Sequence, residues 1–167
     1  MSKPFNGAVA AYIGLGSNLD DPIEQVRSAR ADCAAIPGVR ELAFSSLYRS
    51  SPMGPQDQPD YINAVMAVAT ALEAAVLLRH LQRIEQEHGR IRTQQRWGAR
   101  TLDLDLLIYG EQGIDTGELT VPHPGLGQRA FVLYPLFEIA PELVVPGLGR
   151  IADLVVNCPL EGLKRID

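Results

Sequence analysis

The amino-acid sequence predicts an α+β sandwich, in which an antiparallel sheet carries helices on one face. The first observation is the order of the hydrophobic patterns, because strand, helix and strand are followed by a second strand, helix and strand. The second is a breaker-rich segment at 50–60, which contains three prolines and separates the two halves. Together they are typical of a ferredoxin-like sandwich, here with an extra hairpin and C-terminal helices.

The first half begins with an apolar strand at 8–13, followed by Gly14-Leu15-Gly16-Ser17 as a turn. A helix is expected over 22–36, because Pro22 suits the first helical position and Asp21 can cap it. The alternating segment 42–48 is predicted to be the second strand.

The second half opens with a strand at 61–69 and a helix at 72–88, whose apolar stripe contains Leu77, Leu81 and Ile84. A strand at 102–109 and a short strand pair within 113–121 follow. Further helices are expected around 131–137 and at 151–156. A chain of 167 residues suits one domain, so we expect residues 1–167 to form a single unit.

Composition is typical of a globular protein, with 46% hydrophobic and 21% charged residues. The net charge of −5 argues against a nucleic-acid partner, because phosphate-backbone binding needs a broad basic surface. Apolar runs are too short to span a membrane, and the N-terminal residues lack the apolar region of a signal peptide. We therefore expect a cytoplasmic protein without a membrane partner.

The basic residues are 13 arginines and only two lysines, Lys3 and Lys164, which lie near the termini. A P-loop nucleotide site needs a lysine within a glycine-rich turn, and Schiff-base chemistry needs an interior lysine. Both classes are excluded. Any nucleotide bound here must be held by arginine and metal.

The strongest functional signal is an arginine-rich segment that runs into a strand with two aspartates. The arginines fall within eleven residues: Arg90, Arg92, Arg96 and Arg100. Asp103 and Asp105 follow at i, i+2, so both carboxylates lie on one face of the strand. Mg²⁺ prefers carboxylate oxygens, and guanidinium groups match phosphate oxygens. Either element alone could be a solvated face, but their combination indicates phosphate transfer from a nucleotide.

Asn63 and His123 are two further candidates. Asn63 lies between Ile62 and Ala64 in an expected strand, where a buried amide needs partners. These partners are either the protein's own backbone or a ligand, and the sequence leaves both open. His123 lies between two prolines and is held extended, which favours a contact role for its ring.

Three blocks carry a resemblance to a known family: GPQDQPDY at 54–61, RWGARTLDLD at 96–105 and VPH at 121–123. With these blocks in this order, nearly the whole chain resembles the 6-hydroxymethyl-7,8-dihydropterin pyrophosphokinases of folate biosynthesis. The resemblance implies that the β- and γ-phosphates of ATP move together onto the hydroxymethyl oxygen of the pterin, leaving AMP.

The resemblance also implies a set of residues for each ligand. Two Mg²⁺ ions would be bound by Asp103 and Asp105, which would act in catalysis with Arg90, Arg92 and Arg100. ATP would contact Gln82, Glu85, Arg90, Arg92, Trp97, Arg100, Leu106, Thr120, His123 and Arg129. The pterin would contact Ser50, Ser51, Met53, Tyr61, Asn63, Trp97 and Phe131, with its ring between Tyr61 and Phe131. A monomer is expected.

The sequence departs from the family pattern at Thr93, Glu118 and Pro124, all on the ATP side of the site. Whether Asp103 or a metal-bound water takes the substrate's proton stays open. Two other interpretations use the same residues. One is a different metal-dependent phosphoryl or nucleotidyl transferase on the same fold, and the other is a ligand-sensing module without turnover.

Overall fold

The computed structural model describes residues 7–19, 21–50, 60–89, 102–160 and 162–166. Within them, the main sheet has six strands in the order β10-β3-β4-β1-β5, with β2 also paired to β4. These strands are β1 (Val9–Ser17), β2 (Val39–Phe44), β3 (Tyr48–Ser50), β4 (Tyr61–Thr70), β5 (Asp103–Tyr109) and β10 (Lys164–Arg165). All their pairings are antiparallel.

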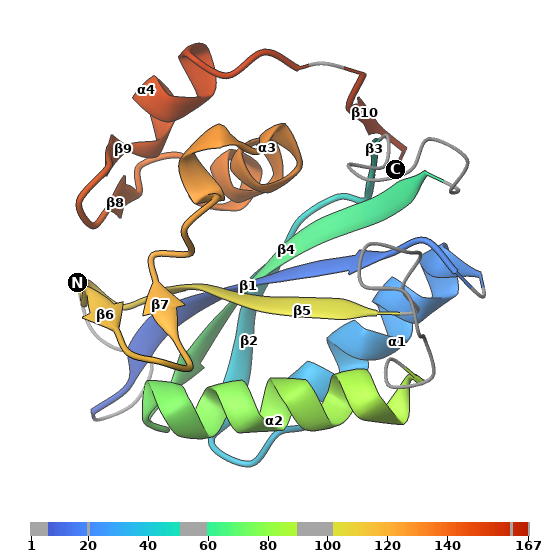
Figure 1. Cartoon of the computed structure of the whole chain (residues 1–167), viewed down its shortest axis with the longest axis vertical. Coiled ribbons are helices and arrows are strands. Elements are labelled where there is room, and N and C mark those ends of the chain that lie inside the picture. The colour runs from blue at the N-terminus through green and yellow to red at the C-terminus, as the bar shows by residue number, and fades with distance from the viewer. Residues whose placement is uncertain (1–6, 20, 51–59, 90–101, 161, 167) are drawn as a thin grey trace.

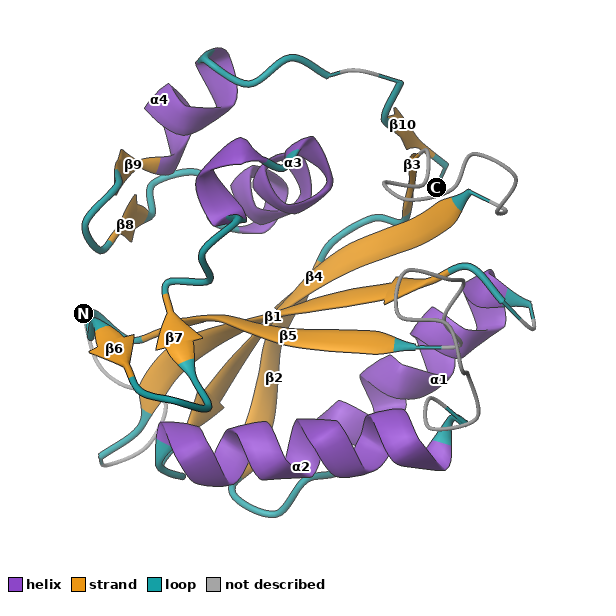
Figure 2. Ribbon diagram, in the orientation of Figure 1, coloured by secondary structure: helices purple, strands orange, loops and turns teal. Residues whose placement is uncertain are grey.

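Helices lie on both sides of this sheet (Figure 1). One face is covered by α1 (Pro22–Ala34) and α2 (Ala74–Glu87), whereas α3 (Ala130–Ile139) lies over the other. Beyond α3 are the small β8 (Val144–Val145) and β9 (Gly149–Arg150) strands and α4 (Ile151–Val156) (Figure 2). β6 (Ile114–Asp115) and β7 (Thr120–Val121) form the predicted extra hairpin. The predicted α+β class and ferredoxin-like order are confirmed, with β2 and β3 together filling the place of one edge strand.

Each face of the sheet has its own core. Residues of α1 and α2 such as Val26, Leu77 and Leu81 pack with Ile13 and Met66 beneath the sheet. On the opposite face, α3 buries Val132, Leu133 and Leu136 against Val65 of β4 and Leu107 of β5. The predicted stripe of Leu77, Leu81 and Ile84 is buried as expected.

The predicted turn at Gly14–Ser17 is wrong, because these residues continue the central strand β1. β1 pairs with β4 on one side and with β5 on the other, so its backbone groups are bonded along both edges. Ile13 and Leu15 are both buried on the face of the sheet that α1 and α2 cover. They therefore continue the alternation of buried residues along β1 past Gly14 and up to Gly16. Pairing on both edges therefore outweighs the low strand preference of glycine.

Two other local expectations are corrected. Asp21 lies in the left-handed region with φ 62° and makes no side-chain cap bond to α1, although Pro22 does begin the helix. The single strand expected at 42–48 is two strands, because Ser45 interrupts it. The Ser45 hydroxyl accepts the N–H of Val65 at 2.9 Å, and the Ser45 N–H donates to the Val65 carbonyl at 2.9 Å.

Candidate active site

The candidate site lies on the face of the sheet that also carries α3. In the strand register, Gly16 of β1 pairs with Asn63 of β4 on one side and with Asp103 of β5 on the other. Directly paired residues project to the same face, so the three form one row across the sheet. Adjacent strands lie about 4.8 Å apart, which separates the backbones of Asn63 and Asp103 by roughly 10 Å.

Gly16 leaves the centre of this row without a side chain. A Cβ atom at this position would lie 3.1 Å from Asn63 Oδ1 and 3.9 Å from the Tyr61 ring. The Gly-x-Gly motif therefore does not form the expected turn. Gly16 instead leaves the sheet backbone uncovered between the Asn63 amide and the Asp103 carboxylate, and this position is called the floor of the site. The period-two spacing of Ile13, Leu15 and Ser17 in the sequence is a signal that predicts the strand and, with it, this floor.

Asn63 is almost fully buried, with 5% of its surface exposed. Its amide nitrogen donates to the hydroxyl oxygen of Ser50 at 2.7 Å, so its partner here is a side chain of β3. An amide has two N–H donors and a carbonyl acceptor, and this bond uses one donor. The Ser50 contact also fixes which way the amide is turned, with its oxygen toward Gly16. Ser50, Tyr61 and Asn63, three of the residues predicted for the pterin, thus lie together.

Asp103 and Asp105 project from β5 to the same face as Asn63. The side chain of Asp105 is about half exposed at 48%, and its Oδ1 lies 3.9 Å from Nε2 of His123. Among the described residues, no group of three or more His, Cys, Asp or Glu side chains is arranged to hold a metal. Two partly exposed carboxylates on one face of a strand suit Mg²⁺, which commonly takes its other ligands from phosphate and water. The donor set therefore fits the predicted ion.

Glu85 has a role that the sequence did not indicate. It is 6% exposed, and its Oε2 accepts the backbone N–H of Leu104 at 2.7 Å. Leu104 lies between the two aspartates, on the strand at the edge of the sheet. Glu85 thus ties α2 to the strand that carries Asp103 and Asp105. Gln82, predicted beside it for ATP, is exposed on the same helix.

A cavity of about 310 Å³ lies beside the outer edge of β5. Its walls include apolar side chains of α2 and β5, the Asp105 carboxylate of β5, and polar groups of the hairpin and of the segment after it. Among the lining residues are Leu78, Leu104, Asp105, Leu106, Thr120 and His123. Three of the residues predicted for ATP therefore meet around one cavity, with Asp105, one of the two aspartates predicted to bind Mg²⁺, on its wall.

His123 is held at both its backbone and its ring. Its N–H donates to the Leu107 carbonyl at 2.9 Å, and its Nδ1 accepts the N–H of Gly125 at 3.2 Å. An accepting Nδ1 places the proton of a neutral ring on Nε2, the nitrogen that faces Asp105. A ligand-contact role for this ring stays a prediction.

Arg129 lies against the same turn. A Cβ atom at Gly125 would lie 2.5 Å from Arg129 Nε, so this guanidinium lies directly against the glycine. The guanidinium carbon of Arg129 is 5.8 Å from the centre of the Phe131 ring at the start of α3. His123 and Arg129 thus both contact Gly125, and His123 also lies beside Asp105 of β5.

Several predicted residues fall elsewhere. Ser51, Met53, Arg90, Arg92, Trp97 and Arg100 lie outside the described residues. Tyr61 begins β4, and Phe131 is on α3, which packs on the same face of the sheet. Their placement on either side of a pterin ring stays a prediction.

Comparison with known proteins agrees with the resemblance seen in the sequence. Residues 12–141 match the family model described as 7,8-dihydro-6-hydroxymethylpterin-pyrophosphokinase. The chain is 50% identical over 147 residues to the 2-amino-4-hydroxy-6-hydroxymethyldihydropteridine pyrophosphokinase of Haemophilus influenzae, covering 88% of this chain and 91% of that protein. The protein of the same name from Pseudomonas aeruginosa is 48% identical over 155 residues, with 93% and 95% covered.

Among solved structures, the chain resembles the wild-type HPPK-DHPS of Plasmodium falciparum crystallised with pterin and p-hydroxybenzoate. The TM-score is 0.74 at 14% identity, over 98% of this chain and 47% of the longer one. At that identity the likeness supports the fold alone. The chain spans about half of that protein but nearly all of the Haemophilus influenzae and Pseudomonas aeruginosa relatives.

No described helix is both long enough and apolar enough to cross a bilayer. The predicted fold is confirmed by the likeness to solved structures, and the predicted enzyme class and family are confirmed by the relatives and by the family model. On this match over most of its length, the chain belongs to the 7,8-dihydro-6-hydroxymethylpterin-pyrophosphokinase family, enzymes of folate synthesis.

Proposed function

We propose that this chain transfers the β- and γ-phosphates of ATP as one unit to the hydroxymethyl oxygen of 6-hydroxymethyl-7,8-dihydropterin. The bond from that oxygen to the β-phosphorus forms while the bond between the β-phosphorus and the α,β-bridging oxygen breaks, and AMP leaves. One observation carries the proposal: Asn63, Gly16 and Asp103 form a row across the sheet. In this row, the Asn63 amide can bind the edge of a heterocycle and the Asp103 carboxylate can bind metal, and the two lie on either side of Gly16.

The pterin lies over Gly16 in this proposal, with its heteroatom edge toward Asn63. A pterin edge alternates donors and acceptors, and a side-chain amide offers both. The bond from Asn63 to Ser50 holds the amide in one orientation before the ligand arrives, which reduces the entropic cost of binding. Tyr61 and Phe131 supply aromatic surface for the two faces of the ring, and Ser51, Met53 and Trp97 complete the predicted contacts.

Asp103 and Asp105 would hold two Mg²⁺ ions together with the triphosphate. When bound, these ions neutralise phosphate charge and align the transferred group. The contribution of the chain is positional: β5 holds both carboxylates on one face, and Glu85 fixes the backbone between them. Phosphoryl-type transfer depends on such positioning and charge stabilisation, so a protein nucleophile is unnecessary.

The cavity beside β5 is proposed to take the adenosine part of ATP, with Leu106 as apolar wall and Thr120 as polar contact. His123 and Arg129 then lie beside the phosphates. The Nε2–H of His123 donates toward a phosphate oxygen, and Arg129 adds a fixed positive charge. Arg90, Arg92 and Arg100 are proposed to contact the triphosphate, with Gln82 at the edge of the nucleotide site. We also propose a monomeric, cytoplasmic enzyme whose single domain is residues 1–167.

Two variants separate the two halves of the proposed site. Asn63→Ala removes the pterin-edge amide and should raise the KM for the pterin by roughly 5–150-fold, as the loss of about 1–3 kcal/mol implies, while the KM for ATP stays unchanged. Asp103→Ala should abolish turnover but leave the thermal unfolding curve close to that of the wild type, because the carboxylate is on the accessible face. Equal loss of both ligands in Asn63→Ala, or near-normal turnover in Asp103→Ala, would contradict the assignment.

A further inference from the structure

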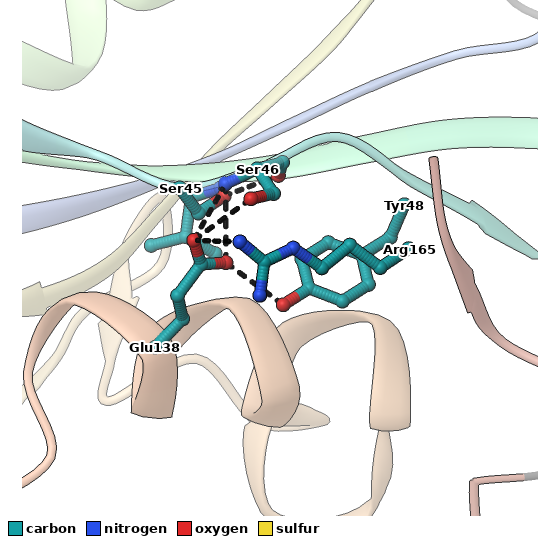
Figure 3. Close-up of polar contacts among 6 residues, drawn as sticks. Ser45, Ser46, Tyr48, Glu138 and Arg165 are labelled. Carbon is teal, nitrogen blue, oxygen red and sulfur yellow. Dashed lines mark hydrogen bonds and ion pairs between the residues drawn. The ribbon is translucent and has the colours of Figure 1, made fainter. Parts of the chain in front are cut away.

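The carboxylate of Glu138 joins segments that are far apart in the sequence. Glu138 lies one residue before the end of α3, and Figure 3 shows its carboxylate pointing toward the sheet. It accepts the hydroxyl of Tyr48 at 2.8 Å, the hydroxyl of Ser46 at 2.9 Å and the backbone N–H of Ser46 at 3.1 Å. Arg165 of β10 forms an ion pair with it at 3.6 Å. These four residues are called the Glu138 cluster.

The cluster is a strong connection, because an ionised acceptor receives several donors at once. Burial and then the hydrogen bond to Glu138 raise the pKa of Tyr48, which keeps its hydroxyl protonated and able to donate. Arg165 pairs with Tyr48 in the register between β10 and β3. Glu138 therefore holds the two outermost strands of this side of the sheet against α3.

On the sheet side, the cluster is adjacent to the amide proposed for the pterin. Tyr48 of β3 is the direct cross-strand partner of Asn63, so the two side chains are neighbours on one face. Ser50 lies two residues after Tyr48 on that same face, and its hydroxyl oxygen accepts the Asn63 amide at 2.7 Å. The position of β3 thus sets the position of Ser50, which in turn orients Asn63.

On the helix side, Glu138 is seven residues after Phe131. Seven residues turn an α-helix by about 700°, so the two side chains lie within roughly 20° of the same side of α3. Val132, Leu133 and Leu136 pack the length of α3 onto the sheet between them. Fixing α3 at Glu138 therefore also determines where its first turn, with Phe131, meets the sheet.

We infer that Glu138 is a positioning residue for the pterin side of the active site. Through β3 it aligns Ser50 and Asn63, and through α3 it aligns Phe131, so one carboxylate sets both the edge contact and the ring contact. The inference rests on the proposed assignment of Asn63 and Phe131 to the pterin. The described hydrogen bonds and ion pair of Glu138 join α3 to Ser46, β3 and β10. The proposed ATP side lies instead on β5, the hairpin and the segment after it, with Arg129 directly before α3 as its one residue next to that helix.

Glu138→Gln tests this with little change in shape. The amide keeps one acceptor oxygen but turns an N–H₂ group toward donors of the cluster and removes the charge. The KM and Kd for the pterin should rise about tenfold, whereas those for ATP should change less than about threefold. Tyr48→Phe removes a single hydroxyl donor and should produce a smaller change in the same direction, which provides a milder variant if Glu138→Gln folds poorly.

Glu41→Gln is the matched control. Glu41 also accepts two hydrogen bonds, at 3.1 and 2.7 Å from Arg30, but it lies on β2 and outside the Glu138 cluster. It should leave the affinities for both ligands unchanged. Pterin binding is measured by isothermal titration calorimetry with a non-hydrolysable ATP analogue and Mg²⁺, and the KM values by AMP release.

A tenfold loss confined to the pterin supports the inference. It is overturned if Glu138→Gln lowers the melting temperature without changing pterin affinity, or if it weakens pterin and ATP equally. Failure of the proposed function can be told apart from failure of this inference, because the wild-type chain would then release no AMP in response to the pterin.

Discussion

Adding one methyl group to the floor of the site provides a sharp test of its geometry. In Gly16→Ala the new Cβ would lie 3.1 Å from Asn63 Oδ1, about 0.3 Å closer than the 3.4 Å at which ordinary contacts begin. Asn63 cannot easily retreat, because its amide nitrogen is bonded to Ser50 at 2.7 Å. Crowding of this kind costs about 1–3 kcal/mol in a packed environment.

The methyl group also projects into the space over Gly16 that is proposed for the pterin, so most of that cost should appear as weaker pterin binding. Alanine suits a strand better than glycine by roughly 0.5–1 kcal/mol, which offsets part of the strain in the free protein. We therefore expect the KM for the pterin to rise about 5–30-fold, equivalent to about 1–2 kcal/mol, with little change in the melting temperature.

Gly14→Ala is the control for this change. It lies two residues away on the same strand and face, but the nearest atoms to its Cβ would be those of the flexible Leu107 side chain, at an ordinary contact distance of 3.4–3.6 Å. That variant should keep both KM values and fold at least as stably as the wild type. The reasoning is refuted if Gly16→Ala binds the pterin normally, or if Gly14→Ala impairs binding just as much.

Two predictions concern stability. Glu85→Ala leaves the buried N–H of Leu104 without its acceptor and should lower the free energy of unfolding in urea by about 2–3 kcal/mol. Gln82→Ala, on the exposed side of the same helix, should change it by less than about 0.5 kcal/mol. Equal effects of the two variants would contradict the role given to Glu85. Burial, with a smaller effect from Asp32, raises the pKa of the Cys33 thiol to about 12, so the folded chain keeps it neutral while the unfolded chain ionises it above roughly pH 8.5. The contribution of this thiol to the free energy of unfolding is therefore fully present below that pH. As the pH rises further, the contribution is lost by up to about 1.4 kcal/mol per pH unit. Urea unfolding between pH 8 and 9.5 should show a shallower decline in Cys33→Ala, and an equally steep decline would contradict the assignment.

Much of the fold could be predicted because its helices and strands have clear apolar periods. The α2 stripe, the strand from Tyr61 and the final helix at Ile151–Val156 all follow from local spacing. The continuation of β1 through Gly14 and Gly16 goes against the low strand propensity of glycine and depends on pairing with β4 and β5, although the period-two spacing of Ile13 and Leu15 is a local signal for it. The split between β2 and β3 depends likewise on a long-range bond from Val65 to Ser45.

The site was predictable where residue chemistry is unusual for its position. Two aspartates and an asparagine in apolar strands are such signals, and the register places Asn63 and Asp103 on either side of Gly16 on one face. Glu85 and Glu138 gave no such signal, because a glutamate on a helix is ordinary. Their roles depend on partners 19 and 90 to 92 positions away, which only the folded chain brings close.

The central claim is a pterin-dependent transfer of pyrophosphate, and AMP release measures it most directly. Purified chain is incubated with ATP, Mg²⁺ and 6-hydroxymethyl-7,8-dihydropterin, and AMP is quantified beside reactions that lack either the pterin or the metal. AMP should form in amounts equal to the pyrophosphorylated pterin, and only when all three are present. Release of ADP in place of AMP, or AMP formation that does not require the pterin, would contradict the account.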